Sequence, residues 1–281
     1  MKLEKILDGV LYEVVQGDVN KEIKLLCYDS RKVDKDTLFV CLTGFQTDGH
    51  DYIKAAIEKG ATAILVEKDV KVADDKVSVI KVMNTRIVLA HIAANFFDNP
   101  TKKLKVVGVT GTKGKTTTTH MCKSIMEAAG VKTGMIGTLG AYIGNEHIET
   151  KNTTPESYEL QELFAKMVDK GCQVAFIEVS SQAVKMHRIE GIRFEVGAFT
   201  NLSPDHISPT EHADFDEYKF YKKEFFRQVE TAVINIDDDN SLEMAAPLKN
   251  PLSPENSTTA SISDSAWSLA FLSTGIISPA R

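Results

Sequence analysis

One segment, residues 105–119, constrains the fold more than any other part of the chain. It opens with a short valine run that is typical of a buried parallel strand. The run breaks at Gly111 and Gly114, and residues 115–129 then follow with helical spacing up to Gly130, a residue that suits a helix C-terminus. A strand, a glycine turn and a helix in this order predict an α/β fold with a phosphate-binding loop.

The glycine turn has the chemistry of a nucleoside triphosphate site. Glycines let backbone N–H groups approach an anion, and the N-terminus of a helix adds partial positive charge. Lys115 would neutralise the β- and γ-phosphates, and the Thr116 hydroxyl would be a ligand of Mg²⁺. Val109 stands where the ordinary Walker A pattern has glycine, so the alternative is a ligand-free turn. The threonine run after Lys115 has poor helix propensity and favours the functional reading. The predicted ATP-binding residues are Gly111, Thr112, Lys113, Gly114, Lys115, Thr116 and Thr117.

Residues 1–100 are expected to form a small α/β domain of their own. The chain length of 281 residues is consistent with about two domains. Strands are predicted near residues 23–28, 37–42, 61–67 and 77–82, and helices over residues 50–59 and 84–97, the second capped by Asn84. Residues 98–101 are the expected linker. Two polar loops, residues 28–31 and 43–49, are by themselves better explained as turns than as binding sites.

Residues 101–281 are expected to form the central domain, a doubly wound, mostly parallel sheet. After the phosphate loop, strands are predicted near residues 132–136, 174–177, 194–199 and 231–236, and helices over residues 155–170 and 216–229. Glu178 follows one of these strands at the carboxyl edge, where ligands bind in open α/β sheets. A carboxylate there suits Mg²⁺, although a solvent-exposed Glu is the alternative. Residues 145–154 are expected to be a polar excursion, and residues 241–281 an irregular or truncated end.

Composition excludes several classes of protein. The net charge of −6 carries no basic footprint, so we expect no nucleic-acid partner. The four cysteines form no CxxC pair and lie in apolar runs, which indicates buried free thiols and a reducing compartment. The N-terminus lacks the pattern of a signal peptide, and no run reaches the ~20 apolar residues of a membrane span. We therefore expect a cytoplasmic, monomeric protein without membrane contact.

Short motifs along residues 23–240, in collinear order, resemble those of the Mur ligases of peptidoglycan synthesis. The likeness is greatest to the MurE type, which adds the third amino acid to the muramyl peptide. The motifs are Asp29-Ser-Arg31, Gly111-Thr-Lys-Gly-Lys-Thr-Thr117, Asn152-Thr-Thr-Pro155, Glu178-Val-Ser-Ser181, Thr200-Asn-Leu-Ser203, Asp205-His206 and the helix Tyr218–Phe226.

The resemblance implies substrate-binding roles for both domains. The uridine diphosphate end of the substrate would be held by Tyr28, Ser30, Phe45, Gln46 and Thr47, which reverses the interpretation of the two loops as turns. The muramyl-dipeptide part would be held by Thr153, Thr154, Ser180 and Arg188. The planar fork of an arginine suits a carboxylate or a phosphate.

The resemblance also implies a catalytic set made of Lys115, Glu178, His206 and Lys222. The metal ligands would be Thr116, Glu178, His206 and Lys222, the last as a carbamate. Carbamylation turns an amine into a carboxylate, which can ligate a hard cation. By pattern alone, Lys219, Lys222 and Lys223 are expected to be a solvated helix face, with none of them singled out.

The implied function is an ATP-dependent, Mg²⁺-dependent amide-forming ligase. It would add meso-diaminopimelate or L-lysine to UDP-N-acetylmuramoyl-L-alanyl-D-glutamate through an acyl phosphate. The family has a C-terminal domain that would follow residue 281, so we expect this chain to bind substrates without joining them. The alternatives are a non-catalytic module that binds a UDP-sugar or nucleotide, or a sister ligase of the MurF or folylpolyglutamate synthetase type. Asp29-Ser-Arg31 and the two loops argue against folate.

Overall fold

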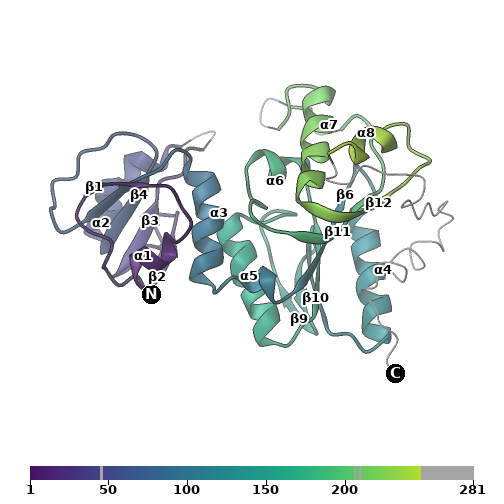
Figure 1. Cartoon of the computed structure of the whole chain (residues 1–281), viewed down its shortest axis with the longest axis horizontal. Coiled ribbons are helices and arrows are strands. Elements are labelled where there is room, and N and C mark those ends of the chain that lie inside the picture. The colour runs from purple at the N-terminus through teal and green to yellow at the C-terminus, as the bar shows by residue number, and fades with distance from the viewer. Residues whose placement is uncertain (45–46, 206, 209–210, 248–281) are drawn as a thin grey trace. The chain divides into compact units, whose positions relative to one another are not determined.

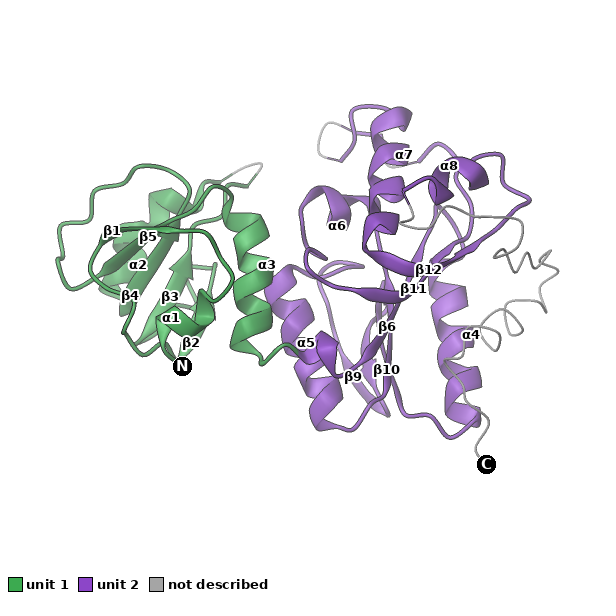
Figure 2. Cartoon of the chain, viewed as in Figure 1, with its two compact units in different colours: residues 1–99 green, residues 100–281 purple. Residues whose placement is uncertain are grey.

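The computed structural model describes residues 1–44, 47–205, 207–208 and 211–247. The chain folds into two compact units, Met1–Asn99 and Pro100–Arg281, which are coloured separately in Figure 2. Each unit has its own sheet, in which most neighbouring strands run parallel. The predicted α/β class with a mostly parallel sheet is confirmed.

The first unit is built on a five-stranded sheet with the order β1-β5-β4-β3-β2. Strands β2 to β5 are parallel to their neighbours, and β1 is antiparallel to β5. The strands are β1 Glu13–Gln16, β2 Leu25–Cys27, β3 Thr37–Val40, β4 Ala61–Val66 and β5 Ser78–Lys81. The helices are α1 Leu3–Ile6, the 3₁₀ helix η1 Gly49–Tyr52, α2 Ile53–Glu58 and α3 Thr85–Phe96.

Local sequence signals explain most of this unit. Phe39 of β3 and Ala56 of α2 belong to one buried cluster, so the apolar face of α2 covers one face of the sheet. The predicted N-cap of α3 is confirmed, because the Asn84 side chain accepts the backbone N–H groups of Arg86 and Ile87. The predicted helix over 50–59 begins instead as a 3₁₀ turn. The sequence predicted neither α1 nor β1.

The second unit contains a seven-stranded sheet with the order β12-β11-β6-β10-β7-β8-β9. Strands β12 to β7 are parallel, and β8 and β9 add an antiparallel hairpin at one edge. The strands are β6 Lys105–Thr110, β7 Thr133–Gly137, β8 Gly140–Ile143, β9 Glu146–Ile148, β10 Val174–Glu178, β11 Phe194–Phe199 and β12 Val229–Ile234. The helices are η2 Pro100–Lys102, α4 Lys115–Ala128, α5 Ser157–Asp169, α6 Ser181–Lys185, α7 Phe215–Glu224, η3 Phe225–Gln228 and α8 Ser241–Ala245.

Helices cover both faces of this sheet, with α4 and α5 on opposite sides in Figure 1. On the α4 side, Val107 packs in one cluster with Cys122 and Met126. On the other side, Val106 belongs to a larger cluster that includes Leu160 and Phe164 of α5. Successive residues of β6 thus point to opposite, buried faces, as the continuous valine run predicts for a doubly wound sheet.

Several elements differ from the expectation. The polar excursion over 145–154 contains β9, which pairs with β8 to make the hairpin. The predicted helix over 216–229 ends as a 3₁₀ turn, and α6 and α8 were not predicted. Helix α8 lies at the start of the segment expected to be irregular, whose residues 248–281 are outside the described part of the chain. The four cysteines are free and buried, as expected.

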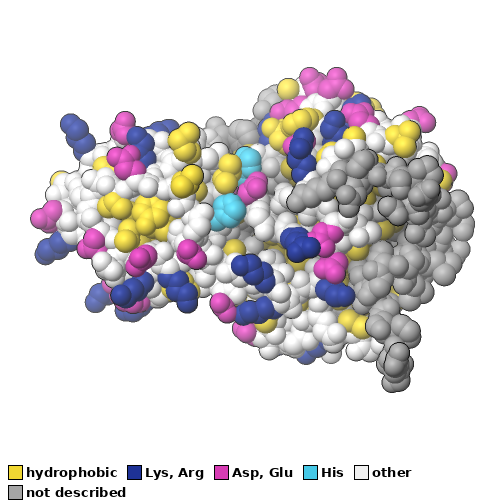
Figure 3. Space-filling view, in the orientation of Figure 1, with side chains coloured by type: hydrophobic (Ala, Val, Ile, Leu, Met, Phe, Trp, Pro, Cys, Tyr) yellow, Lys and Arg dark blue, Asp and Glu magenta, His cyan; other side chains and the backbone are white. Residues whose placement is uncertain are grey.

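Among the described residues, no helix combines the length and apolar character that crossing a membrane would require. On the face shown in Figure 3, basic and acidic side chains are interspersed over both units.

Candidate functional site

The carboxyl ends of three neighbouring strands form the floor of the candidate site. In the sheet register, Glu178 of β10 pairs with Val109 of β6, and Phe199 of β11 pairs with Thr110. The loops that follow β6, β10 and β11 therefore leave the sheet side by side. This is the position at which open α/β sheets bind ligands.

The phosphate loop between β6 and α4 depends on two glycines with positive φ. Gly111 has φ of 145° and Gly114 has φ of 86°, angles that L-residues with side chains rarely adopt. A Cβ on Gly111 would also lie 1.9 Å from the Thr200 hydroxyl oxygen. The glycine at position 111 is therefore required twice, for its backbone angle and for the close approach of the loop after β11.

The segment 200–203 fixes the phosphate loop from one side. The Thr112 N–H donates to the Asn201 carbonyl at 2.8 Å, and the Lys113 N–H donates to Asn201 Oδ1 at 3.0 Å. The Thr112 hydroxyl accepts the Ser203 N–H at 3.0 Å and lies 3.1 Å from the Tyr218 hydroxyl of α7. Burial raises the pKa of Tyr218 to about 12, so its hydroxyl stays protonated at neutral pH.

Lys115 stands at the mouth of the loop. Its ammonium group donates to the carbonyl oxygens of Gly111 at 2.9 Å and Thr112 at 3.1 Å. Burial lowers the pKa of Lys115, while the carboxylates of Glu178 and Asp205 oppose that shift. The lysine is thus held within the loop to which the sequence assigns phosphate binding.

Glu178 is 1% exposed, so the alternative of a solvent-exposed carboxylate at a strand end is wrong. Its side chain points into the site. Its carboxylate accepts the Thr116 hydroxyl at 2.9 Å, and from Thr138 both the N–H at 3.0 Å and the hydroxyl at 3.1 Å. Gly137 makes room for it, because a Cβ there would lie 2.1 Å from Glu178 Oε1. Thr138 was not among the residues predicted for the site. Its position at the carboxyl end of a predicted parallel strand could have indicated it.

Lys222 is buried, so the expectation of a solvated helix face is wrong at this position. Its residue is 1% exposed, and its amine donates to the Gly111 carbonyl at 2.8 Å. Burial and the nearby charge of Lys115 lower its pKa well below the usual value. Lys219 and Lys223, in contrast, both pair with Glu243 near the surface.

The four residues assigned to the muramyl-dipeptide part lie near Glu178. The Thr153 hydroxyl is 3.1 Å from that of Thr138. The buried Thr154 hydroxyl donates to the Glu178 carbonyl at 2.8 Å and accepts the Ser180 N–H at 3.1 Å. Ser180 also caps α6, a role that occupies its hydroxyl oxygen.

Arg188 lies beside these threonines and carries the positive charge of the group. Its guanidinium is paired with Glu156 at 2.7 Å and donates to the Thr154 carbonyl at 3.2 Å. Both partners of the ion pair are largely buried, so the fork of Arg188 is held in one orientation.

Those residues assigned to the uridine diphosphate that the structure describes lie at the carboxyl edge of the first sheet. Tyr28 and Ser30 follow β2, and Thr47 belongs to the loop that follows the neighbouring strand β3. Phe45 and Gln46 of that loop, together with His206 of the second unit, lie outside the described residues.

The donors at Glu178 fit a magnesium ion. Mg²⁺ prefers oxygen ligands and usually binds one or two carboxylates, several waters and substrate phosphates. The Thr116 hydroxyl and the Glu178 carboxylate lie within hydrogen-bond distance at the N-terminus of the helix that follows the phosphate loop, and they supply such oxygens. No cluster of three or more His, Cys, Asp or Glu suited to a metal is present in the described part of the chain.

Comparisons with known proteins give a consistent result. The Mur ligase middle domain matches residues 109–274, and the Mur ligase family catalytic domain matches residues 22–97. A UDP-N-acetylmuramoyl-L-alanyl-D-glutamate--2,6-diaminopimelate ligase of Clostridium perfringens is 45% identical over 238 residues, which are 85% of this chain and 49% of that protein. Ligase 1 of that name in Clostridium acetobutylicum is 48% identical with the same coverage. The chain thus spans about half the length of these relatives.

Solved structures show the same fold at lower identity. One of a UDP-N-acetylmuramoyl-L-alanyl-D-glutamate--2,6-diaminopimelate ligase has a TM-score of 0.73 at 24% identity, covering 88% of this chain and 49% of the other. A MurF ligase from Thermotoga maritima in complex with ADP has a TM-score of 0.55 at 23% identity, covering 80% and 48%. Since one family match spans more than half of the residues and the other most of the first unit, this chain belongs to the Mur ligase family.

Proposed function

We propose that the chain carries the UDP-substrate and ATP sites of a MurE-type ligase, which joins 2,6-diaminopimelate to UDP-N-acetylmuramoyl-L-alanyl-D-glutamate. The observation that carries the proposal is the placement of the Glu178 carboxylate against Thr116, in the first turn of α4 just after the phosphate loop. Relatives named for this activity are 45% and 48% identical to the chain over 238 aligned residues, which favours diaminopimelate over lysine.

The reaction would proceed in two steps, phosphoryl transfer and then amide formation. One of the two free carboxylates of the D-glutamyl residue attacks the γ-phosphorus of ATP, which forms an acyl phosphate and releases ADP. The amine of the diamino acid then attacks the acyl carbon, loses a proton and expels inorganic phosphate, which leaves the new amide. Both steps depend on positioning and on neutralising charge on the phosphoryl oxygens.

The chain's own residues have distinct parts in this scheme. Lys115 would turn from the Gly111 and Thr112 carbonyls toward the transferring phosphoryl group. Thr116 and Glu178, with His206, would hold Mg²⁺, which when bound neutralises phosphate charge. Arg188, held by Glu156, would meet a carboxylate of the dipeptide. Tyr28, Ser30, Phe45, Gln46 and Thr47 would hold the uridine diphosphate.

Lys222 would join this set as a carbamate. Only a neutral amine attacks CO₂, and burial favours the neutral form of Lys222. The attack forms an N–C bond and releases one proton. The product is an anionic group with two oxygens, which can ligate Mg²⁺ where the ammonium form cannot.

Calorimetry with the 281-residue chain tests the proposal. UDP-N-acetylmuramoyl-L-alanyl-D-glutamate should bind, and Mg²⁺-ATP should bind more weakly after Glu178→Gln, which keeps the shape of the side chain but removes its charge. Glu195→Gln, at a half-exposed position on β11, is the matched control and should leave both affinities unchanged. Equal ATP affinity in wild type and Glu178→Gln would contradict the assignment of Glu178. If UDP-N-acetylmuramoyl-L-alanyl-D-glutamate does not bind, its assignment as the substrate is wrong.

A further inference from the structure

Helix α6 is short, and the segments at its two ends contact the same residue, Thr154. At its N-terminus the Ser180 N–H donates to the Thr154 hydroxyl at 3.1 Å. After its C-terminus the Arg188 guanidinium donates to the Thr154 carbonyl at 3.2 Å and pairs with Glu156 at 2.7 Å. A continuing helix would carry residue 188 about 12 Å along the axis from residue 180, so the helix has to end for Arg188 to come back toward Thr154.

The turn that ends α6 has the hydrogen bonds of a Schellman motif. The His187 N–H donates to the Val184 carbonyl at 3.0 Å, and the Arg188 N–H donates to the Ala183 carbonyl at 2.8 Å. This motif needs a left-handed residue one position past the C-cap, and that residue is usually glycine. The C-cap here is Met186, so the left-handed position is 187, where φ is 54°.

A histidine therefore stands where glycine is favoured. A left-handed backbone costs more free energy in a residue with a Cβ than in glycine. The imidazole adds little stability: its Nδ1 lies 3.2 Å from Glu190 Oε2, but both side chains are 36% exposed, so solvent weakens this contact. The feature that the surrounding structure holds at position 187 is thus the backbone angle, and strain of this kind is common beside functional sites.

The backbone of Arg188 is fixed on both sides. Before it lies Ala183, whose carbonyl accepts the Arg188 N–H, and after it lies Ile189. Both of these residues belong to the same buried cluster, with exposed fractions of 0% and 1%. Once the turn has set the direction of the chain, the Arg188 side chain, 11% exposed, reaches Glu156. The angle at position 187 therefore decides from which direction Arg188 enters the site.

We infer that His187 is a positioning residue for substrate binding: its left-handed backbone ends α6 and directs Arg188 toward the muramyl-dipeptide part of the substrate. The inference rests on the proposed function, because that function assigns Arg188 to a carboxylate of the dipeptide. A residue that holds the left-handed angle poorly opens the turn in part of the molecules. The apparent affinity then falls in proportion to the fraction that keeps Arg188 in place.

Three substitutions at position 187 separate the backbone from the side chain, with binding of UDP-N-acetylmuramoyl-L-alanyl-D-glutamate to the 281-residue chain measured by calorimetry. His187→Gly removes the imidazole but keeps the left-handed angle, so its affinity should stay within about twofold of wild type. His187→Ala removes the same imidazole and disfavours the angle, so binding should weaken about threefold. His187→Val is β-branched, for which this angle is a genuine outlier, and should weaken binding about tenfold.

Gly171 supplies a matched control for backbone strain alone. It is the left-handed residue, with φ of 76°, in the same motif after α5, where the Cys172 N–H donates to the Met167 carbonyl at 2.9 Å. This turn leads into β10 and so lies at the amino edge of the sheet, away from the candidate site. A Cβ on Gly171 would meet no atom within 4 Å. Gly171→Ala should unfold at a lower urea concentration and leave the affinity unchanged.

A double-mutant cycle tests whether position 187 acts through Arg188. Arg188→Gln alone should weaken binding on the order of tenfold or more, because it removes a charge-assisted bond to a carboxylate. In that background His187→Val should add less than about twofold, since the side chain that it would misplace is already absent. A further tenfold loss would overturn the inference, because position 187 would then act on the ligand by another route.

The outcomes separate this inference from the function on which it rests. If wild type does not bind, the proposed function is wrong and the role of His187 falls with it. If wild type binds and His187→Val binds equally well, the positioning role is wrong and the proposed function stands. The same holds if His187→Gly is as weak as His187→Val, because the side chain would then matter and not the angle. Should His187→Val fail to fold, equal affinities of His187→Gly and His187→Ala would overturn the inference.

Discussion

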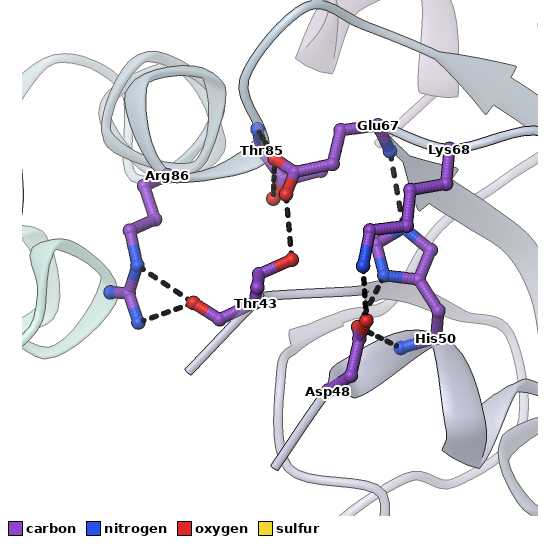
Figure 4. A network of polar contacts seen from close by, with 7 residues as sticks. All are labelled: Thr43, Asp48, His50, Glu67, Lys68, Thr85 and Arg86. Carbon is purple, nitrogen blue, oxygen red and sulfur yellow. Dashed lines mark hydrogen bonds and ion pairs between the residues drawn. The ribbon is translucent and has the colours of Figure 1, made fainter. Parts of the chain in front are cut away.

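The two loops assigned to phosphate-bearing ligands are held by different kinds of contact. The phosphate loop of the second unit is held mostly by buried contacts, from the hydroxyls of Thr112 and Tyr218 and from the amine of Lys222, which donates to the Gly111 carbonyl. The loop 43–49 of the first unit is held by ionisable side chains, with Asp48 and Glu67 as acceptors (Figure 4). Salt screens buried contacts much less than partly exposed charged contacts. The phosphate loop should therefore keep its shape over a wider range of salt concentration than the loop 43–49.

The sharpest test of this contrast is to remove charge from the phosphate loop. Lys115→Ala should weaken ATP binding on the order of 100-fold, because the variant cannot form a charge-assisted bond to phosphate. The protein should stay folded, since among the described residues the lysine donates only to two backbone carbonyls. Calorimetry with Mg²⁺-ATP measures it. Lys132→Ala, at an exposed position just before β7, is the control and should leave the ATP affinity unchanged. Equal ATP affinity in a folded Lys115→Ala would contradict the assignment.

Lys222 should matter more for stability than its neighbours on α7. Lys222→Ala removes a fully buried side chain and its bond to the Gly111 carbonyl, for a loss of about 2 kcal/mol in the free energy of unfolding. Lys219→Ala and Lys223→Ala each remove an ion pair to Glu243 near the surface and should cost less than about 0.5 kcal/mol. Urea unfolding compares the three. If all three variants lose a similar free energy of unfolding, Lys222 has no special structural role and the three lysines form one basic helix face.

Glu67→Gln should loosen the loop of the first unit. Glu67 accepts hydrogen bonds from Thr43 and twice from Thr85, so an amide nitrogen in its place must face a donor. The expected cost is about 1 kcal/mol. Hydrogen exchange at the Gly44 and Gly49 N–H groups, which close the loop by backbone hydrogen bonds, should become faster. Glu58→Gln, on the exposed end of α2, should leave both rates as they are. Unchanged exchange in Glu67→Gln would show that the backbone alone holds the loop.

The smallest effect is expected at Asp29. The hydrogen bond from Arg31 lowers the pKa of this carboxyl from 3.8 to about 2. A lowered pKa adds stability that is present above about pH 4 and is lost as the pH falls toward 2. The loss should stay under about 1 kcal/mol, because Arg31 is 82% exposed. Acid unfolding curves of wild type, Asp29→Asn and Arg31→Gln should show it, with the pH dependence reduced in both variants. If the stability of the variants depends on pH as strongly as that of wild type, the Asp29–Arg31 pair does not contribute to this pH dependence.

The parts of the fold that sequence predicted are those with local causes. The valine run before Gly111 and the helix after Gly114 lie where expected, because a continuous apolar run and a glycine turn act within a few residues. The Asn84 cap was predicted for the same reason. Strand β9 was missed because two of its three residues are exposed, so it has no apolar alternation to read.

The candidate site shows the corresponding limit. Glu178 was placed correctly at the carboxyl edge, since the strand before it has a clear apolar pattern. The burial of Lys222 could not be read from the pattern of its helix, because its partner Gly111 lies 111 residues earlier in the chain. The substrate, metal and catalytic roles of the site residues remain predictions, and the experiments above address them.

The β8–β9 hairpin has a consequence for how this protein behaves in concentrated solution. Without it, β7 would be an open parallel edge of buried, apolar residues, ready to pair with a strand of another molecule. The hairpin moves that edge outward to β9, a strand of three residues with Glu146 and His147 exposed. Lys170 pairs with Glu146 at 3.4 Å and adds another charge there. A short, charged outer strand discourages edge-to-edge association, so this hairpin protects the sheet that holds the phosphate loop against aggregation.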